Sequence, residues 1–82
     1  MKMEDLAKRL RASGEIEKCC LAAVIEHECK RIETESFEGI GKTVYYLNGC
    51  IEAICAFGEI AEAEKRELCA DIDARAYGGP VA

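Results

Sequence analysis

Tryptophan is absent from this 82-residue chain, proline occurs once, and only five residues are aromatic. The scarcity of proline leaves long stretches free to form helix, because proline breaks the interior of helices and sheets. Half of the residues are hydrophobic and a third are charged, a balance that excludes an intrinsically disordered chain. We therefore expect a folded, helix-rich protein.

Long apolar runs are also lacking. The longest, residues 19–25, is far shorter than the ~20 residues that a membrane-spanning helix needs. The first residues include Glu4 and Asp5, where a secretion signal has a basic region followed by an apolar one. These features predict a cytoplasmic protein with no membrane span and no secretion signal.

Basic residues are outnumbered, with 11 Lys and Arg against 16 Asp and Glu and a net charge of −5. Nonspecific binding to nucleic acid or to an anionic membrane depends on Lys and Arg that neutralise phosphate, so we do not expect it. An acidic surface suits a protein partner that has a basic surface.

The length predicts a single helical domain over residues 1–82, because a second domain could not bury a useful core. Domains of this size bury only about 60% of their unfolded surface, and association is one route to further stability. A homo-oligomer is therefore expected.

The chain has six cysteines but no Cys-x-x-Cys pair. All six lie within helical patterns, whereas disulfide scaffolds are rich in loops, so we interpret them as reduced thiols that pack as small hydrophobic side chains. A thiol-based metal or redox module remains an alternative. The cysteines are Cys19, Cys20, Cys29, Cys50, Cys55 and Cys69.

Helical spacing of apolar residues predicts an all-α fold, a small self-associating bundle of three to four helices. Gly14 and Gly58 lie where a left-handed residue ends a helix, and residues 78–80 end the last one. The segment 36–41 contains two glycines and is expected to be the main loop, with Thr43 as the N-cap after it. The predicted helices span residues 3–13, 15–35, 43–58 and 60–77.

The predicted second helix carries apolar residues on two faces, which must both be covered. We expect part of the second or third helix to form the interface between subunits. One face of the second helix has Ile16, Cys19, Cys20, Ala23, Val24 and His27, and the other has Leu21, Ile25, Cys29 and Ile32.

The predicted third helix is apolar over most of its circumference and is expected to be the central, most buried helix. Tyr46 is predicted to pack in the core. One stripe consists of Val44, Leu47, Ile51 and Ile54, and the second of Tyr46, Cys50, Ala53 and Phe57.

Two motifs suggest chemistry without meeting its requirements. Gly41-Lys42-Thr43 resembles the end of a phosphate-binding P-loop, but Ser36 stands where the first glycine belongs and no strand precedes it. Cys20 and His27 are two helical turns apart, about 10 Å, too far for a nucleophilic pair. A metal site that joins them to a cysteine of another helix stays open, but we predict no catalytic residue, metal or cofactor.

Surface residues are the remaining candidates. The pairs at 8–9, 30–31 and 65–66 each join Lys to Arg and could meet on a phosphate-bearing ligand. Tyr45, Asn48 and Glu52 could line a pocket or a partner contact. The candidate partner or ligand surface is Lys30, Arg31, Tyr45, Asn48, Glu52, Lys65 and Arg66.

The sequence as a whole predicts a non-enzymatic, acidic helical interaction protein that binds a protein partner and modulates or inhibits it. Phage-encoded anti-defence inhibitors of nucleic-acid-handling enzymes are similar in size and charge. Two alternatives stay open: a small-molecule or nucleotide-binding protein with its ligand at an oligomer interface, and the thiol-based metal or redox module.

Overall fold

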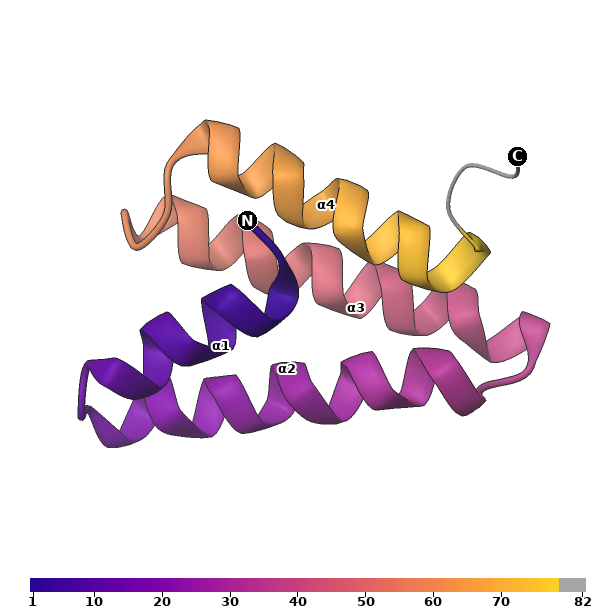
Figure 1. Ribbon diagram of the computed structural model, residues 1–82, viewed down its shortest axis with the longest axis horizontal. Coiled ribbons are helices and arrows are strands. Elements are labelled where there is room, and N and C mark those ends of the chain that lie inside the picture. The colour runs from indigo at the N-terminus through magenta and orange to yellow at the C-terminus, as the bar shows by residue number, and fades with distance from the viewer. Residues whose placement is uncertain (79–82) are drawn as a thin grey trace.

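Four helices and no strand make up the part of the chain that the computed structural model describes, residues 1–78 without the side chain of Phe37 (Figure 1). The prediction of a small all-α bundle is confirmed. The helices are α1 (Met3–Ala12), α2 (Ile16–Thr34), α3 (Phe37–Ala56) and α4 (Glu62–Tyr77).

Helices α2 and α3 form an antiparallel pair that runs the length of the molecule (Figure 1). The short α1 packs mainly on α2, and α4 packs mainly on α3. The result is an elongated bundle of 37 × 23 × 18 Å. Because α1 is the shortest helix, it covers only part of α2.

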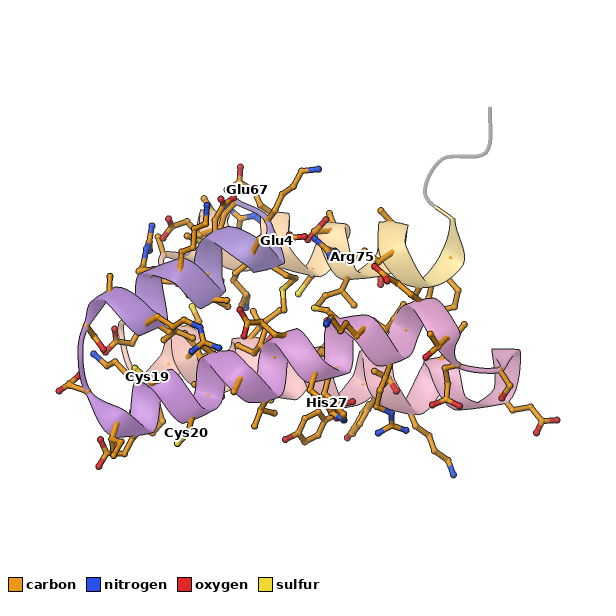
Figure 2. All side chains as sticks on the ribbon, turned by 60° about the horizontal axis from the view of Figure 1, so that its bottom comes forward. Glu4, Cys19, Cys20, His27, Glu67 and Arg75 are labelled. Carbon is orange, nitrogen blue, oxygen red and sulfur yellow. The ribbon has the colours of Figure 1, made fainter. Side chains whose placement is uncertain are left out.

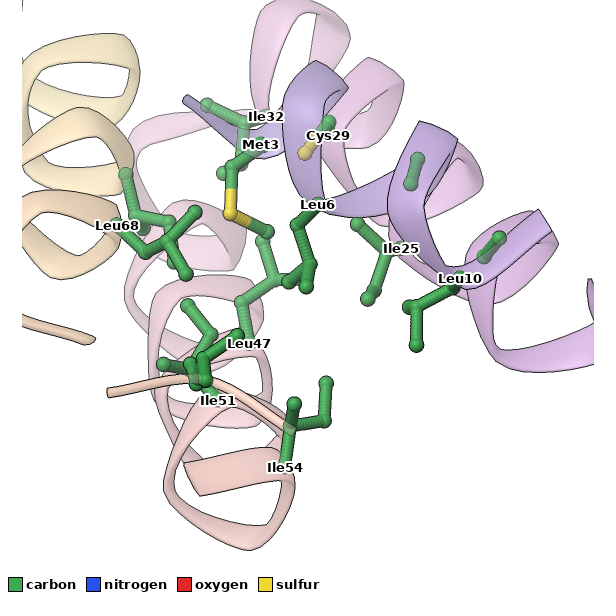
Figure 3. Packing of buried hydrophobic residues seen from close by; sticks show 14 of the residues in the cluster. Met3, Leu6, Leu10, Ile25, Cys29, Ile32, Leu47, Ile51, Ile54 and Leu68 are labelled. Carbon is green, nitrogen blue, oxygen red and sulfur yellow. The ribbon is translucent and has the colours of Figure 1, made fainter. Parts of the chain in front are cut away.

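The core lies where the apolar stripes of all four helices meet (Figure 3). Helix α1 contributes residues spaced three and four apart, which fall on one helical face. Of the two predicted stripes of α3, the one that contains Leu47 and Ile51 is buried, and of the two predicted faces of α2, the one that contains Ile25 and Ile32 turns inward. The largest fully buried side chains are Met3, Leu6, Ile25, Leu47, Ile51, Leu68 and Ile72.

The two predicted glycine turns are confirmed. Gly14 has φ of +73° and Gly58 has φ of +82°, a left-handed conformation that glycine adopts without a steric penalty. After the second turn Ile60 is buried in the core, and α4 starts at Glu62. The turn itself therefore contributes to packing.

The predicted loop over 36–41 is wrong, because α3 begins at Phe37. Ser36 is the N-cap, and its side chain accepts a 3.4 Å hydrogen bond from the backbone N–H of Gly39. Thr43 is not a cap; its side chain is buried and its hydroxyl donates to the Gly39 carbonyl at 3.4 Å. Each helical glycine costs about 1 kcal/mol, and packing of this first part of α3 into the bundle offsets that cost.

An ionic cluster fixes the start of α1 against α4. The Asp71 carboxylate accepts a hydrogen bond from the backbone N–H of Met3 at 2.9 Å and one from Arg75 Nε at 3.0 Å. Arg75 also donates to Glu4 (Figure 2). One carboxylate thus satisfies a backbone donor in the first turn of α1, which has no partner within its own helix.

Replacing Leu47 with Ala is expected to lower the free energy of unfolding by about 2–5 kcal/mol, because the side chain is fully buried and leaves a cavity. The control is Tyr77→Ala on α4, whose side chain is 53% exposed and whose loss should change stability by about 0.5 kcal/mol or less. Urea denaturation at one fixed protein concentration measures both. Equal effects of the two substitutions would contradict the assigned core.

Lowering the pH should break the ion pair between Glu4 and Arg75. The hydrogen bond from Arg75 holds the pKa of Glu4 below its ordinary value of 4.5, so the ionised carboxylate favours the folded state at neutral pH. That contribution is complete above pH 4.5 and is lost as the pH falls through the lowered pKa. We expect Glu4→Gln to be less stable than the natural chain at pH 7, by an amount that shrinks progressively below pH 4.5.

Denaturation series at several pH values test this expectation. The matched control is Glu33→Gln, since Glu33 is exposed and makes no ion pair within residues 1–78. A stability difference for Glu4→Gln that stays constant from pH 7 to pH 3 would contradict the assigned ion pair.

Candidate functional site

One of the two apolar faces of α2 is left uncovered by the bundle. The side chains of Ile25 and Ile32 are buried, whereas Ile16 is 74% exposed. In Figure 2, Cys20 and His27 project from the side of α2 that faces away from α1 and α4. The expectation that both faces are covered is therefore not met within one chain.

Helix α3 is exposed along a similar stripe. Tyr45 and Phe57 are each 84% exposed, and Tyr46 is 49% exposed. The prediction that Tyr46 packs in the core is wrong. The inner side of α3 is already occupied by the stripe of Leu47 and Ile51, and no helix within residues 1–78 covers the opposite side.

The two exposed stripes join into one surface. At one end the Lys18 ammonium of α2 pairs with Glu59 at 2.8 Å, which places the start of α2 beside the segment that follows α3. At the other end the Tyr46 hydroxyl lies against the Cys50 thiol and near Glu28 of α2, and these neighbours raise the pKa of Tyr46. The stripes therefore lie side by side along the helix pair.

We call this surface the α2–α3 face. It contains large side chains at both ends, small ones in the middle, and no Asp, Glu, Lys or Arg. Its residues are Ile16, Cys20, Ala23, Val24, His27, Tyr45, Tyr46, Gly49, Ala53 and Phe57.

The exposed apolar area is large for so small a chain. At about 200 Å² per aromatic side chain, the exposed fractions of Tyr45, Tyr46 and Phe57 correspond to roughly 400 Å². The remaining seven residues of the face add to that area. Monomeric proteins rarely leave contiguous apolar patches much above a few hundred Å² exposed to water, and larger ones mark interaction sites.

The predicted candidate residues are only partly brought together. Glu52 of α3 pairs with Lys65 of α4 at 3.3 Å. Arg31 is engaged within α2, at 3.5 Å from Glu28 and 3.0 Å from Glu35. Glu52 and Arg31 are therefore already paired with opposite charges in the folded chain.

The other predicted residues are scattered. Tyr45 belongs to the α2–α3 face, whereas Lys30 and Arg66 are exposed elsewhere. Asn48 is half-buried, and its Oδ1 is buried without a hydrogen-bond partner among the described residues. Of the seven candidates, only Tyr45 lies on the largest exposed apolar surface.

A second feature is a cleft of about 360 Å³ bounded by α1, α2 and α4. Its floor is apolar and includes the Cys29 thiol, whose pKa burial raises to about 11. Lysines from two predicted Lys-Arg pairs meet at its rim. Sequence reasoning missed the cleft, because residues from three different helices form it. The lining residues are Met3, Glu4, Lys8, Ile25, Glu26, Cys29, Lys30, Glu33 and Arg75.

Metal chemistry finds no support in this arrangement. Within residues 1–78, no group of three or more His, Cys, Asp or Glu side chains is placed to hold a metal ion. His27 is exposed on the α2–α3 face. The open possibility of a site that joins Cys20, His27 and a cysteine of another helix is therefore not formed within one chain.

Comparison with known proteins gives no information about this site. No protein-family model, curated protein or solved structure matches this chain. Over the described range 1–78, no helix is both long enough and apolar enough to pass through a membrane.

The reactivity of the thiols should follow their exposure. Cys20 is exposed, whereas Cys29 is buried and its raised pKa leaves almost no reactive thiolate at neutral pH. We expect a maleimide to modify Cys20 of the monomer, in protein too dilute to self-associate, well before Cys29, and Cys29 only after denaturation. Mass spectrometry of the labelled peptides measures both rates. Labelling of the two at the same rate would contradict the assigned burial, and labelling that requires a reductant would contradict the prediction of reduced thiols.

Proposed function

We propose that this chain is a non-enzymatic interaction protein that binds a protein partner and modulates or inhibits it. The α2–α3 face carries this proposal. An apolar, uncharged surface that spans two helices gains free energy when another protein removes it from water, at about 25 cal/mol per Å². Catalysis needs titratable groups held together against a reacting atom, and on this face Cys20 and His27 lie two helical turns apart along α2.

The face has the composition of a binding surface. Tyr45 and Phe57 supply large, exposed side chains near its two ends, and aromatic residues dominate the affinity of protein interfaces. Gly49 and Ala53 lie between them along α3 and leave room for side chains of a partner. An apolar helix or helix pair fits this surface best.

The charge around the face favours a basic partner. The net charge of −5 raises the rate at which positively charged proteins encounter the chain, an effect that salt weakens. Nucleic-acid-handling proteins of the cytoplasm have such basic surfaces. We place the partner in that class.

A second candidate function rests on the cleft. Its volume lies within the ordinary range for small-molecule sites, and Lys8 and Lys30 make no ion pair within residues 1–78. A ligand with an apolar body and one phosphate or carboxylate would place its anion at the two ammonium groups and away from the carboxylates of Glu26 and Glu33, which share the rim. A rise in melting temperature with such ligands, lost in Lys30→Ala, would favour this function.

Phe57→Ser is expected to abolish most protein binding, because a large aromatic side chain that anchors an interface typically contributes about 2 kcal/mol or more, roughly a thirtyfold change in Kd. Tyr77→Ser, also an exposed aromatic but outside the face, is the control. The tagged variants are incubated with cell extract, and bound proteins are quantified by mass spectrometry at low and high salt. Identical sets of bound proteins for both variants would overturn the proposed function.

A further inference from the structure

The composition of the α2–α3 face restricts what covers it. None of its ten residues carries a formal charge other than His27 when protonated. Interfaces between identical subunits are more apolar than those of partners that also exist apart. The carboxylates that attract a basic partner lie outside the face, so its occupant must match it in apolar character.

The exposed area is of the size that a dimer requires. A stable interface buries about 800 Å² on each partner. The three aromatic side chains of the face provide roughly half of this, and seven further exposed residues extend the surface. One copy of the face is therefore large enough to be half of a specific interface.

Two unpaired charges border opposite ends of the face. Glu17 is exposed in the first turn of α2, beside Ile16. Lys42 is exposed on α3, three residues before Tyr45. Neither makes an ion pair within residues 1–78. Glu17 is thus an unpaired anion at one end of the face and Lys42 an unpaired cation at the other, where the exposed Glu38 lies one helical turn before Lys42.

A two-fold rotation makes these ends complementary. When the axis lies in the plane of the face and across the helices, the Ile16–Phe57 end of one copy meets the end of the other copy that carries Tyr45 and Tyr46. The same rotation lays α2 on α2 and α3 on α3 of the second copy. It brings Glu17 to the level of Lys42 of the second copy, on the neighbouring helix, and symmetry repeats the pair. Opposite rim charges steer association and fix the register of the two copies.

We propose that a second copy of this chain covers the α2–α3 face, in a two-fold symmetric dimer in which Glu17 of each copy lies at the level of Lys42 of the other. This inference rests on the proposed function, since it names the protein that the face binds. Each copy brings α2 and α3 to the interface, so that four antiparallel helices meet there.

Sedimentation velocity over a range of micromolar concentrations tests the dimer. The natural chain should sediment at about 18 kDa, twice its 9.0 kDa mass. Phe57→Ser should raise the dimer Kd by roughly tenfold or more, and Tyr77→Ser should leave it unchanged. Circular dichroism verifies that both variants stay helical, as expected for substitutions of exposed side chains.

Charge reversal tests the register. Glu17→Lys and Lys42→Glu should each weaken the dimer severalfold, because each places like charges together in both symmetry-related pairs. The double variant, Glu17→Lys with Lys42→Glu, should restore the Kd. Failure of the double variant to recover would overturn the proposed register.

The outcomes separate this inference from the proposed function. A natural chain that stays monomeric, but binds another protein that Phe57→Ser releases, would overturn the dimer and support the proposed function. A dimer that Phe57→Ser leaves intact would overturn the assigned interface. If Phe57→Ser changes neither self-association nor binding to any other protein, both proposals fail.

Discussion

The pairing of α2 with α3 is the constraint on which the rest of the molecule depends. The inner residues of the two helices, among them Ile25, Leu47 and Ile51, are fully buried. They form the surface on which α1 and α4 pack. Once these stripes face inward, helical periodicity places the second apolar stripe of each helix outward. The exposed face is thus a consequence of the same pairing that builds the core.

Ionic contacts determine how the two shorter helices sit on this pair. Apolar packing is not directional, whereas the Asp71 carboxylate binds one particular backbone N–H, that of Met3. Arg9 adds a second contact, with its guanidinium donating to both oxygens of Glu64 at 3.3 and 2.9 Å. Both contacts join α1 to α4, so the N-terminal helix is oriented by residues more than fifty positions away in the sequence.

The helices were predictable because local rules decide them. Gly14 and Gly58 end helical patterns in the sequence and adopt left-handed conformations in the structure. The same local rules gave a wrong prediction for the segment 36–41. Its glycines lower the local stability of a helix, but tertiary packing compensates for that loss, and α3 begins at Phe37. A prediction from local helix propensity does not include the stabilisation that tertiary packing provides.

The candidate site was less predictable. The two apolar faces of α2 are visible in the sequence, but local sequence rules do not determine which face turns inward. For the same reason the prediction that Tyr46 packs in the core is wrong. The cleft and the contact between Asp71 and Met3 join distant segments, and one sequence carries no signal for such contacts. The sequence indicates Lys30 as a candidate by its charge alone, whereas the structure places it at the rim of the cleft, with Lys8 and above an apolar floor.

The arrangement of the surfaces allows several kinds of binding at once. The α2–α3 face uses the outer side of the helix pair, whereas the cleft lies where α1 and α4 approach another side of α2. A protein bound to the face therefore leaves the cleft open. In the proposed dimer both clefts and the helices α1 and α4 of both copies remain exposed, whereas the second copy competes with any other protein for the α2–α3 face.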